Sequence, residues 1–322
     1  MKSVLLPKSA RKTSQLGFGC ALGSAIRERD AATLLDAAYD AGIRYFDVAP
    51  LYLDGAAEGY VGKFLSKHDD ISVATKYGLL PTSDEAFRTR FMRVLLKPAH
   101  RSMRAGMKWP FQEKISAISR HKANYTAEEM QRSLNRSSAL LKRSYIDVLL
   151  FHEPDAYDLD DERLTDSVRQ SVAEGRIGAI GIGTRSHQAR EVFQTHSSFW
   201  DVVQYDWNAF SGSRLFPSTF QIFFWVAGQN LQKIHRLFLR DDDLVRHWSD
   251  EVGLDLHQPE NLRTLLFKSA LLANDDGITL VSSTNIDHIY KNVAIAENSS
   301  LDRSARIFLD LARAGGPRKL PG

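Results

Sequence analysis

The chain has 322 residues, of which 43% are hydrophobic and 25% are charged, and its formal net charge is +3. These values fit one globular domain over residues 1–322, and so small a positive excess argues against a nucleic-acid partner. The single cysteine, Cys20, excludes a disulfide within the chain and favours a reducing compartment.

The apolar runs of the sequence are short. Only three consecutive apolar residues precede Pro7, which is too few for the core of a secretory signal. No run approaches the roughly 18 apolar residues that a membrane span requires. We therefore expect a cytoplasmic protein without a membrane partner, which acts as a monomer or a weak homo-oligomer.

Strand-like and helix-like patterns alternate along the chain, which favours a parallel sheet with crossover helices. Short apolar runs predict strands at residues 16–20, 43–47, 71–76, 145–152, 177–183, 201–204, 220–225 and 277–281. Amphipathic patterns predict helices at residues 30–41, 58–66, 126–141, 161–174, 187–196, 260–272, 285–296 and 302–312. This order predicts an α/β fold, a (β/α)8 TIM barrel.

Capping residues predict where several of these helices begin and end. Asp30 is expected to cap the first helix, and Gly42 to end it. Thr126 and Glu129 have the spacing of a capping box. Gly175 is expected to end the helix that begins at residue 161.

Two segments exceed the usual length of a loop in a β/α unit, and we expect them to be insertions after strand 3 and strand 7, at residues 79–125 and 228–258. Both would lie on the face that carries the site in a barrel, which makes them candidate lids. The first contains a run of seven cations. These are Arg88, Arg90, Arg93, Lys97, Arg101, Arg104 and Lys108. They fit either a solvated surface or a site for an anionic substrate.

Four side chains with useful chemistry follow three successive predicted strands. Asp47 ends the second strand, and Tyr52 lies five residues later. Lys76 ends the third strand, and His152 ends the fourth. Because the carboxyl ends of the strands in a parallel barrel converge on one mouth, we expect these four side chains to share a site.

These residue types suit the reduction of a carbonyl group. A tyrosine phenol, with an ordinary pKa of about 10, is a weak proton donor, and a neighbouring lysine would lower that pKa. Asp47 would keep Lys76 charged and oriented, and His152 could hold the carbonyl oxygen. Taken singly, each residue has a structural interpretation, such as a turn aspartate or a packed tyrosine. The combination favours catalysis.

Residues 42–52 have the form Gly-x-Arg-x-Phe-Asp-x-Ala-x-x-Tyr, and with the run at residues 145–152 they resemble the aldo-keto reductase family. The resemblance extends from about residue 16 to residue 298. It implies an NAD(P)H-dependent oxidoreductase that reduces an aldehyde, ketone or sugar carbonyl, or catalyses the reverse reaction. It also implies a catalytic set of Asp47, Tyr52, Lys76 and His152. The dinucleotide would bind without the glycine fingerprint of a Rossmann fold.

The resemblance further implies a cofactor site at the strand ends, with NADP(H) favoured over NAD(H). Gln204 would bind the carboxamide and Phe224 would stack on the nicotinamide ring. The remaining expected cofactor residues are Gly19, Cys20, Asp47, Gly183, Thr184, Ser282, Ser283, Thr284, His288 and Asn292. Gly183–Thr184 replaces the usual Ser-Asn pair, and Ser282 and His288 stand where many relatives have cations. The cluster at residues 282–284 also fits a plain helix cap.

Other functions remain open. A regulatory or scaffold barrel could bind the dinucleotide with little turnover, and an isomerase or lyase on the same barrel would need no dinucleotide. Turnover of NADPH or NADH with a panel of aldehydes separates these classes. A metal enzyme is not expected, since the chain has no His-Glu-x-x-His motif and no paired cysteines.

Overall fold

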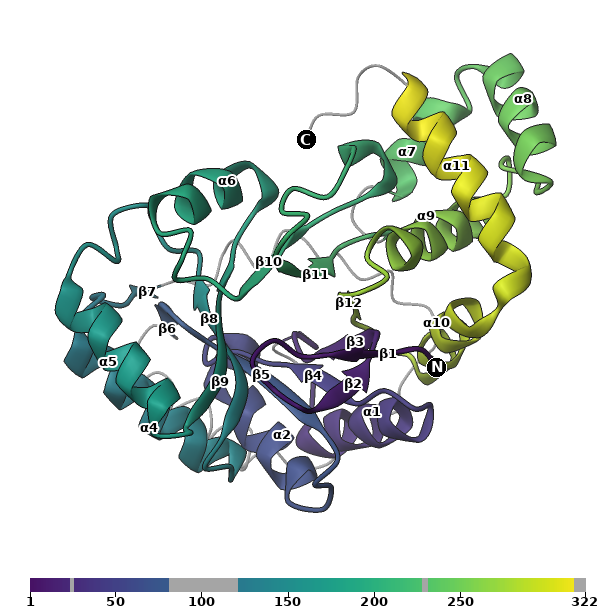
Figure 1. Cartoon of the computed structure of the whole chain (residues 1–322). Coiled ribbons are helices and arrows are strands. Elements are labelled where there is room, and N and C mark those ends of the chain that lie inside the picture. The colour runs from purple at the N-terminus through teal and green to yellow at the C-terminus, as the bar shows by residue number, and fades with distance from the viewer. Residues whose placement is uncertain (24–25, 81–120, 228–230, 316–322) are drawn as a thin grey trace.

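Eight parallel strands close into a barrel in the computed structural model, which describes residues 1–23, 26–80, 121–227 and 231–315 (Figure 1). The strands follow chain order around the barrel, and the last pairs with the first. They are β3 (Leu16–Gly19), β4 (Tyr45–Asp47), β5 (Ser72–Tyr77), β8 (Ile146–His152), β9 (Ile177–Gly183), β10 (Val202–Asp206), β11 (Phe220–Phe224) and β12 (Ile278–Val281). The predicted (β/α)8 barrel is confirmed.

Helices surround the barrel and cover the outer side of its strands (Figure 1). The sequence patterns located eight of them, each beginning within two residues of the predicted position. These are α1 (Glu28–Asp40), α2 (Ala57–Leu65), α4 (Ala127–Leu141), α5 (Glu162–Ala173), α6 (Ser186–Thr195), α9 (Pro259–Ala273), α10 (Ile286–Glu297) and α11 (Asp302–Gly315).

Alternating side chains fill both the barrel interior and the layer beneath the helices. In β8, Val148 and Leu150 belong to the interior cluster, whereas Leu149 and Phe151 belong to the outer one. The interior cluster also contains Val4, from a hairpin formed by β1 (Ser3–Leu5) and β2 (Lys12–Ser14). Because this hairpin directly precedes β3, it fills the amino end of the barrel. The carboxyl ends of the strands are left for a site.

The residues at the helix termini confirm three of the capping predictions and correct one. Gly175, with a φ of +70°, directly follows the C-cap of α5. Thr126 accepts a hydrogen bond from the backbone N–H of Glu129 at 3.2 Å, and Gly42 has the left-handed φ of +92° that ends α1. The prediction that Asp30 caps α1 is wrong, because the helix begins at Glu28 and its N-cap is Arg27. Asp30 lies in the first turn, where a carboxylate interacts favourably with the helix dipole, and it pairs with Arg27 at 2.7 Å.

The first insertion begins and ends at one small sheet. After β5, β6 (Leu79–Leu80) pairs antiparallel with β7 (His121–Lys122), so the chain leaves and returns at adjacent positions. Residues 81–120 lie outside the described part of the chain. The seven predicted cations and the lid function proposed for them lie outside it as well.

The second insertion contains two helices, α7 (Leu231–Phe238) and α8 (Asp242–Val252). The Trp248 ring of α8 lies 5.1 Å from the ring of Phe238 and 5.6 Å from that of Phe308 in α11. Figure 1 shows α8 beside α11 at the edge of the molecule. The apolar side chains of α8 thus pack against α11 and against Phe210 of η2 (Ala209–Ser211), which follows β10, and the lid role of this insertion stays a prediction.

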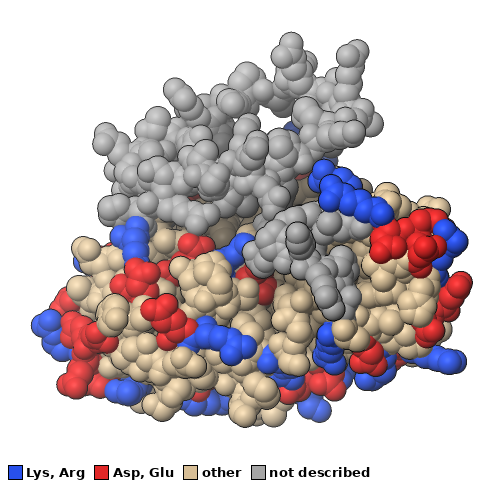
Figure 2. All heavy atoms as spheres, turned by 90° about the horizontal axis from the view of Figure 1, so that it is seen from above, with Lys and Arg blue, Asp and Glu red and all other residues tan. Residues whose placement is uncertain are grey.

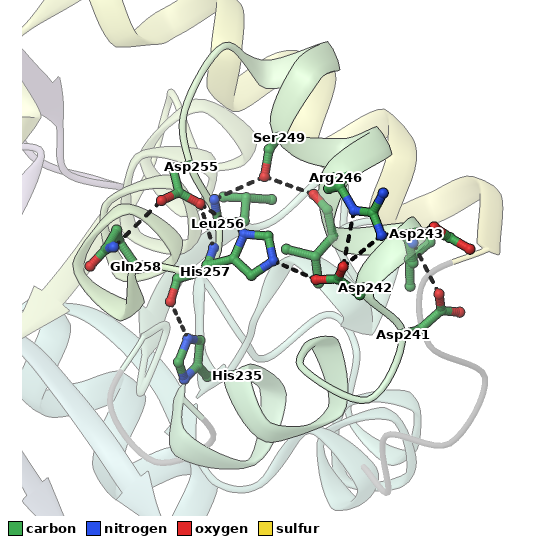
Figure 3. A network of polar contacts seen from close by, with 12 residues as sticks. His235, Asp241, Asp242, Asp243, Arg246, Ser249, Asp255, Leu256, His257 and Gln258 are labelled. Carbon is green, nitrogen blue, oxygen red and sulfur yellow. Dashed lines mark hydrogen bonds and ion pairs between the residues drawn. The ribbon is translucent and has the colours of Figure 1, made fainter.

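A histidine between two carboxylates connects α8 to the segment before α9 (Figure 3). His257 Nε2 lies 2.8 Å from Asp242 Oδ1, and His257 Nδ1 lies 2.9 Å from Asp255 Oδ1. His235 of α7 donates to the carbonyl of His257 at 2.8 Å. Only a protonated imidazole can donate from both nitrogens. The hydrogen bonds to Asp242 and then Asp255 accordingly raise the pKa of His257.

This network predicts a pH-dependent contribution to stability. The raised pKa of His257 means that its contribution is complete below about pH 6.5, the ordinary histidine value, and is lost as pH rises through the folded-state pKa. The pKa of Asp242 is lowered, so protonation of the carboxylates limits the contribution only at acidic pH. His257→Gln should lower the unfolding midpoint at pH 6 more than at pH 9 in urea titrations. His187→Gln, an exposed histidine on α6, is the control; equal effects of both variants would contradict the prediction.

Charge is mixed over the surface that Figure 2 draws. Lysines and arginines are interspersed there with aspartates and glutamates, so the described residues of that face form no broad area of one sign. Within the described ranges, no helix combines the length and apolar character needed to cross a membrane.

Candidate active site

A buried ion pair lies at the carboxyl ends of neighbouring strands. Asp47 ends β4, and its Oδ1 accepts a hydrogen bond from Lys76 Nζ of β5 at 2.5 Å. Lys76 also donates to the carbonyl of Val48 at 3.1 Å. Both charged residues are only 2% exposed. The second oxygen of Asp47 accepts from Gln204 Nε2 of β10 at 2.8 Å, so three strands share one connected polar group.

The charge of Lys76 is maintained by its neighbours. Burial alone lowers the pKa of a lysine. The negative charge of Asp47, together with Tyr52 and the hydrogen bonds to both residues, outweighs burial and raises the pKa of Lys76 above its ordinary value. The side chain is therefore an ammonium group throughout the physiological range.

Tyr52 and His152 complete the group of four. Tyr52 begins a short 3-10 helix, η1 (Tyr52–Gly55), five residues after the end of β4. Lys76 Nζ lies 4.9 Å from the centroid of the Tyr52 ring, and the His152 ring stands perpendicular to that ring at 6.2 Å. The structure thus brings together all four side chains that the sequence predicted to meet. Their catalytic role stays a prediction.

The phenol of Tyr52 differs from expectation in its acidity. Burial raises the pKa of Tyr52, the charge and hydrogen bond of Lys76 lower it, and the charge of Asp47 raises it. The net result is a pKa above the ordinary value of 10.0. The predicted effect of Lys76, a lowering of the Tyr52 pKa, has the expected sign, but burial outweighs it. The phenol carries its proton at neutral pH.

Strained backbone lies next to these strand ends. Leu53, Asp54, Glu153 and Trp225 adopt positive φ angles of 52–57° without being glycine. They follow β4, β8 and β11. Each such conformation costs about 1–3 kcal/mol and is typical of functional sites.

The predicted carboxamide-binding residues are brought close to the ion pair. Besides its bond to Asp47, Gln204 accepts at its backbone carbonyl from the N–H of Thr184 at 3.0 Å. A Cβ on Gly183 would lie 3.0 Å from Gln204 Oε1. The Thr184 hydroxyl is buried and donates to Gln188 at 3.1 Å, so its proton is already engaged. Phe224 is half-buried at the end of β11.

Gly19, Cys20 and Ser282 form a second close group. Ser282 Oγ donates to the carbonyl of Gly19 at 2.8 Å, which ties the end of β12 to the end of β3. The backbone N–H of Cys20 donates to the carbonyl of Asp47 at 2.8 Å. Burial, followed by the charge of Asp47, raises the pKa of the Cys20 thiol, so it remains neutral.

The residues around the start of α10 act partly as caps. Asn285 Oδ1 accepts from the N–H of Asp287 at 2.9 Å, and Ser283 Oγ accepts from the N–H of Asn285 at 3.0 Å. Asn292 is buried and accepts from Arg263 of α9 at 2.6 Å. Thr284 and His288 are exposed, and no contact within the described chain joins them to the Asp47–Lys76 pair.

Three charged residues near the strand ends were not predicted. Glu58 of α2 is 1% exposed and accepts from the hydroxyl of Thr75, the neighbour of Lys76, at 2.6 Å. Arg263 adds a cation beside Asn292. Arg185 lies over the ring of Trp225 at 4.1 Å. Arg185 could have been suspected, because it follows the predicted strand end at Gly183.

Comparisons with known proteins identify relatives of this chain. The model of the Aldo/keto reductase family matches residues 15–220. A D-threo-aldose 1-dehydrogenase from a Pseudomonas species is 31% identical over 177 residues, which are 52% of this chain and 49% of that enzyme. A pyridoxal 4-dehydrogenase from Microbacterium luteolum is 28% identical over 199 residues, 57% of this chain and 55% of that enzyme. The chain thus matches about half the length of these relatives.

Solved structures share the fold over nearly the whole chain. The glycerol dehydrogenase from Gluconobacter oxydans aligns with a TM-score of 0.67 at 15% identity and covers 99% of this chain and 97% of its own. The holo form of an aldo-keto reductase from Bacillus halodurans aligns with a TM-score of 0.62 at 20% identity, with 96% of each chain covered. At such identities the likeness establishes the fold alone.

Proposed function

The chain belongs to the Aldo/keto reductase family, and from this premise we propose that it is an NAD(P)H-dependent oxidoreductase. It reduces an aldehyde, ketone or sugar carbonyl to the alcohol, or catalyses the reverse reaction. The observation that carries the proposal is the buried Asp47–Lys76 pair with the Tyr52 and His152 rings beside it.

Tyr52 is the proposed proton donor. Burial keeps the phenol protonated at neutral pH, and its proton passes to the carbonyl oxygen as negative charge develops there. Lys76 then stabilises the phenolate, and Asp47 keeps Lys76 charged. In the reverse direction the phenolate accepts the proton of the alcohol. His152 holds the substrate oxygen close to Tyr52 through a hydrogen bond.

The strand ends suit a nicotinamide dinucleotide, which supplies or accepts the hydride when bound. The Gln204 amide retains a second N–H and its Oε1 beside Gly183, where no Cβ intervenes, and both groups complement a carboxamide. The half-buried ring of Phe224 offers a surface for the nicotinamide. We favour NADP(H) over NAD(H), since Asn292, one of the expected cofactor residues, accepts a hydrogen bond from the cationic Arg263 at 2.6 Å, and a guanidinium there suits a 2′-phosphate.

The proposed substrates are small aldehydes and sugars. The names of the relatives point to an aldose and pyridoxal as compounds that those enzymes act on. Each is a small polar molecule with a carbonyl or a hydroxyl group at the reacting position. The same chemistry suits a site with one phenol and one imidazole at the barrel mouth.

The purified protein should oxidise NADPH in the presence of at least one member of a panel of aldoses and aromatic aldehydes. The measurement is the loss of absorbance of the reduced nicotinamide, repeated with NADH. Tight binding of either dinucleotide by calorimetry, without turnover across the panel, would contradict the proposal and favour a regulatory barrel. A reaction that proceeds without any dinucleotide would favour an isomerase or lyase.

A further inference from the structure

An arginine and a tryptophan meet across three adjacent strand ends of the barrel mouth. Gly183, the last residue of β9, pairs with His152 of β8 and with Gln204 of β10. Arg185 follows two residues later. Trp225 directly follows β11, which pairs with β10. The two residues therefore lie next to the strands that carry His152 and Gln204.

The guanidinium of Arg185 is held on two sides. Its Cζ lies 4.1 Å from the centroid of the Trp225 ring, which is close enough for a cation–π contact. Its Nε lies 3.7 Å from Asp206 Oδ1, and the same oxygen accepts from the backbone N–H of Ser186 at 2.7 Å. Stacking on the ring and the fixed carboxylate orient the planar group.

The Arg185 guanidinium nevertheless donates no hydrogen bond to any described residue, because its nearest carboxylate oxygen, Asp206 Oδ1, is 3.7 Å away. Its side chain is 36% exposed. Two arginines of similar exposure behave differently: Arg44, at 30%, donates to Asp70 and to the carbonyl of Tyr39, and Arg11, at 37%, donates to the carbonyl of Ile71. An oriented guanidinium with free donors beside a candidate active site is suited to an oxyanion.

The backbone supports a functional interpretation of this pair. Trp225 has a φ of +57°, which is rarely tolerated by a bulky side chain. Its ring contacts Arg185 on one side and lies 5.1 Å from the Phe224 ring. Strain of this kind persists where it places a side chain that the site requires.

We propose that Arg185, oriented by Trp225 and Asp206, binds an anionic oxygen group of a ligand in the barrel mouth. The group is a carboxylate or a phosphate, which belongs either to the carbonyl substrate or to the diphosphate of the dinucleotide. This inference rests on the proposed function and specifies in addition that the ligand carries a negative charge.

The test compares 4-carboxybenzaldehyde with benzaldehyde in wild type and Arg185→Met. Charge-assisted hydrogen bonds at a partly exposed arginine predict a loss of about tenfold in affinity for the anionic ligand. If the substrate supplies the anion, KM for 4-carboxybenzaldehyde rises about tenfold and KM for benzaldehyde changes much less. If the dinucleotide supplies it, the dissociation constants of NADPH and NADH both rise about tenfold, and the two aldehydes respond alike at saturating dinucleotide.

Two further variants separate anion binding from a structural role. Arg185→Lys keeps the charge but loses the planar stack on Trp225, so its affinity for the anionic ligand should lie between those of wild type and Arg185→Met. If Arg185 has only a structural role, both variants should change ligand affinity to the same extent, and both should lower the thermal unfolding midpoint. Arg190→Met, an exposed arginine on the same helix, makes the same change in net charge and should leave all constants unchanged.

The inference is overturned if neither ligand class loses affinity in Arg185→Met, or if Arg190→Met has the same effect. Calorimetric titrations of the dinucleotides and of 4-carboxybenzaldehyde need no turnover. They therefore report on Arg185 even if the protein reduces neither aldehyde, which distinguishes a failure of this inference from a failure of the proposed function.

Discussion

Tyr52→Phe should lower the rate of hydride transfer about 10²–10⁴-fold, the usual contribution of a general acid. The substitution removes one oxygen and leaves the ring against His152. Single-turnover measurements with saturating reduced dinucleotide isolate the chemical step, and the dissociation constant of the dinucleotide should change little. Tyr60→Phe, a half-buried tyrosine on α2, is the matched control and should keep the wild-type rate.

The pH dependence gives a second readout of the same assignment. Because burial raises the pKa of Tyr52, the phenol stays protonated and the reduction rate should hold until pH exceeds about 10. Oxidation of the alcohol needs the phenolate and should accelerate as pH rises toward that value.

Lys76→Met removes the charge that opposes the rise in the pKa of Tyr52, so it should slow the chemical step by about the same factor as Tyr52→Phe. An unchanged hydride-transfer rate in either variant would exclude the assignment.

Asp47→Asn should lower the free energy of unfolding by about 3–5 kcal/mol, because it leaves the Lys76 ammonium buried without an anion. Urea unfolding measures the change. Asp30→Asn breaks a pair of the same residue classes on the surface, with Arg27, and should cost less than about 1 kcal/mol.

A double substitution tests whether the cost comes from the unpaired charge. Asp47→Asn combined with Lys76→Met removes both charges, so the double variant should be more stable than Asp47→Asn alone. If the two single losses simply add, the pair contributes no coupling energy, and the cause lies in packing instead.

Strand positions were predictable because strands that are buried on both faces, such as the run at residues 145–152, appear in the sequence as continuous apolar segments. The meeting of Asp47 with Lys76 followed from the convergence of parallel strands at one mouth. The bond between Gln204 and Asp47 did not follow, because it joins side chains 157 residues apart and depends on the register around the closed barrel.

The sequence alone was also insufficient where two physical effects oppose each other. The pKa of Tyr52 depends on whether burial or the Lys76 charge prevails, and burial is known only from the packed structure. Asp30 was a good cap by residue type, yet α1 begins at Glu28. The contact between Arg185 and Trp225 joins two loops that the linear pattern treats separately.

The pairing of β6 with β7 marks a place where the length of the chain can change without altering the barrel. Leu80 lies opposite His121, so the two ends of the connection between β6 and β7 are adjacent before α4 begins. Doubling the length of a loop whose ends are already adjacent costs only about 0.6 kcal/mol in entropy, so barrel closure sets little limit on its length. The length of this connection can therefore change while the eight strands and the buried ion pair keep their arrangement.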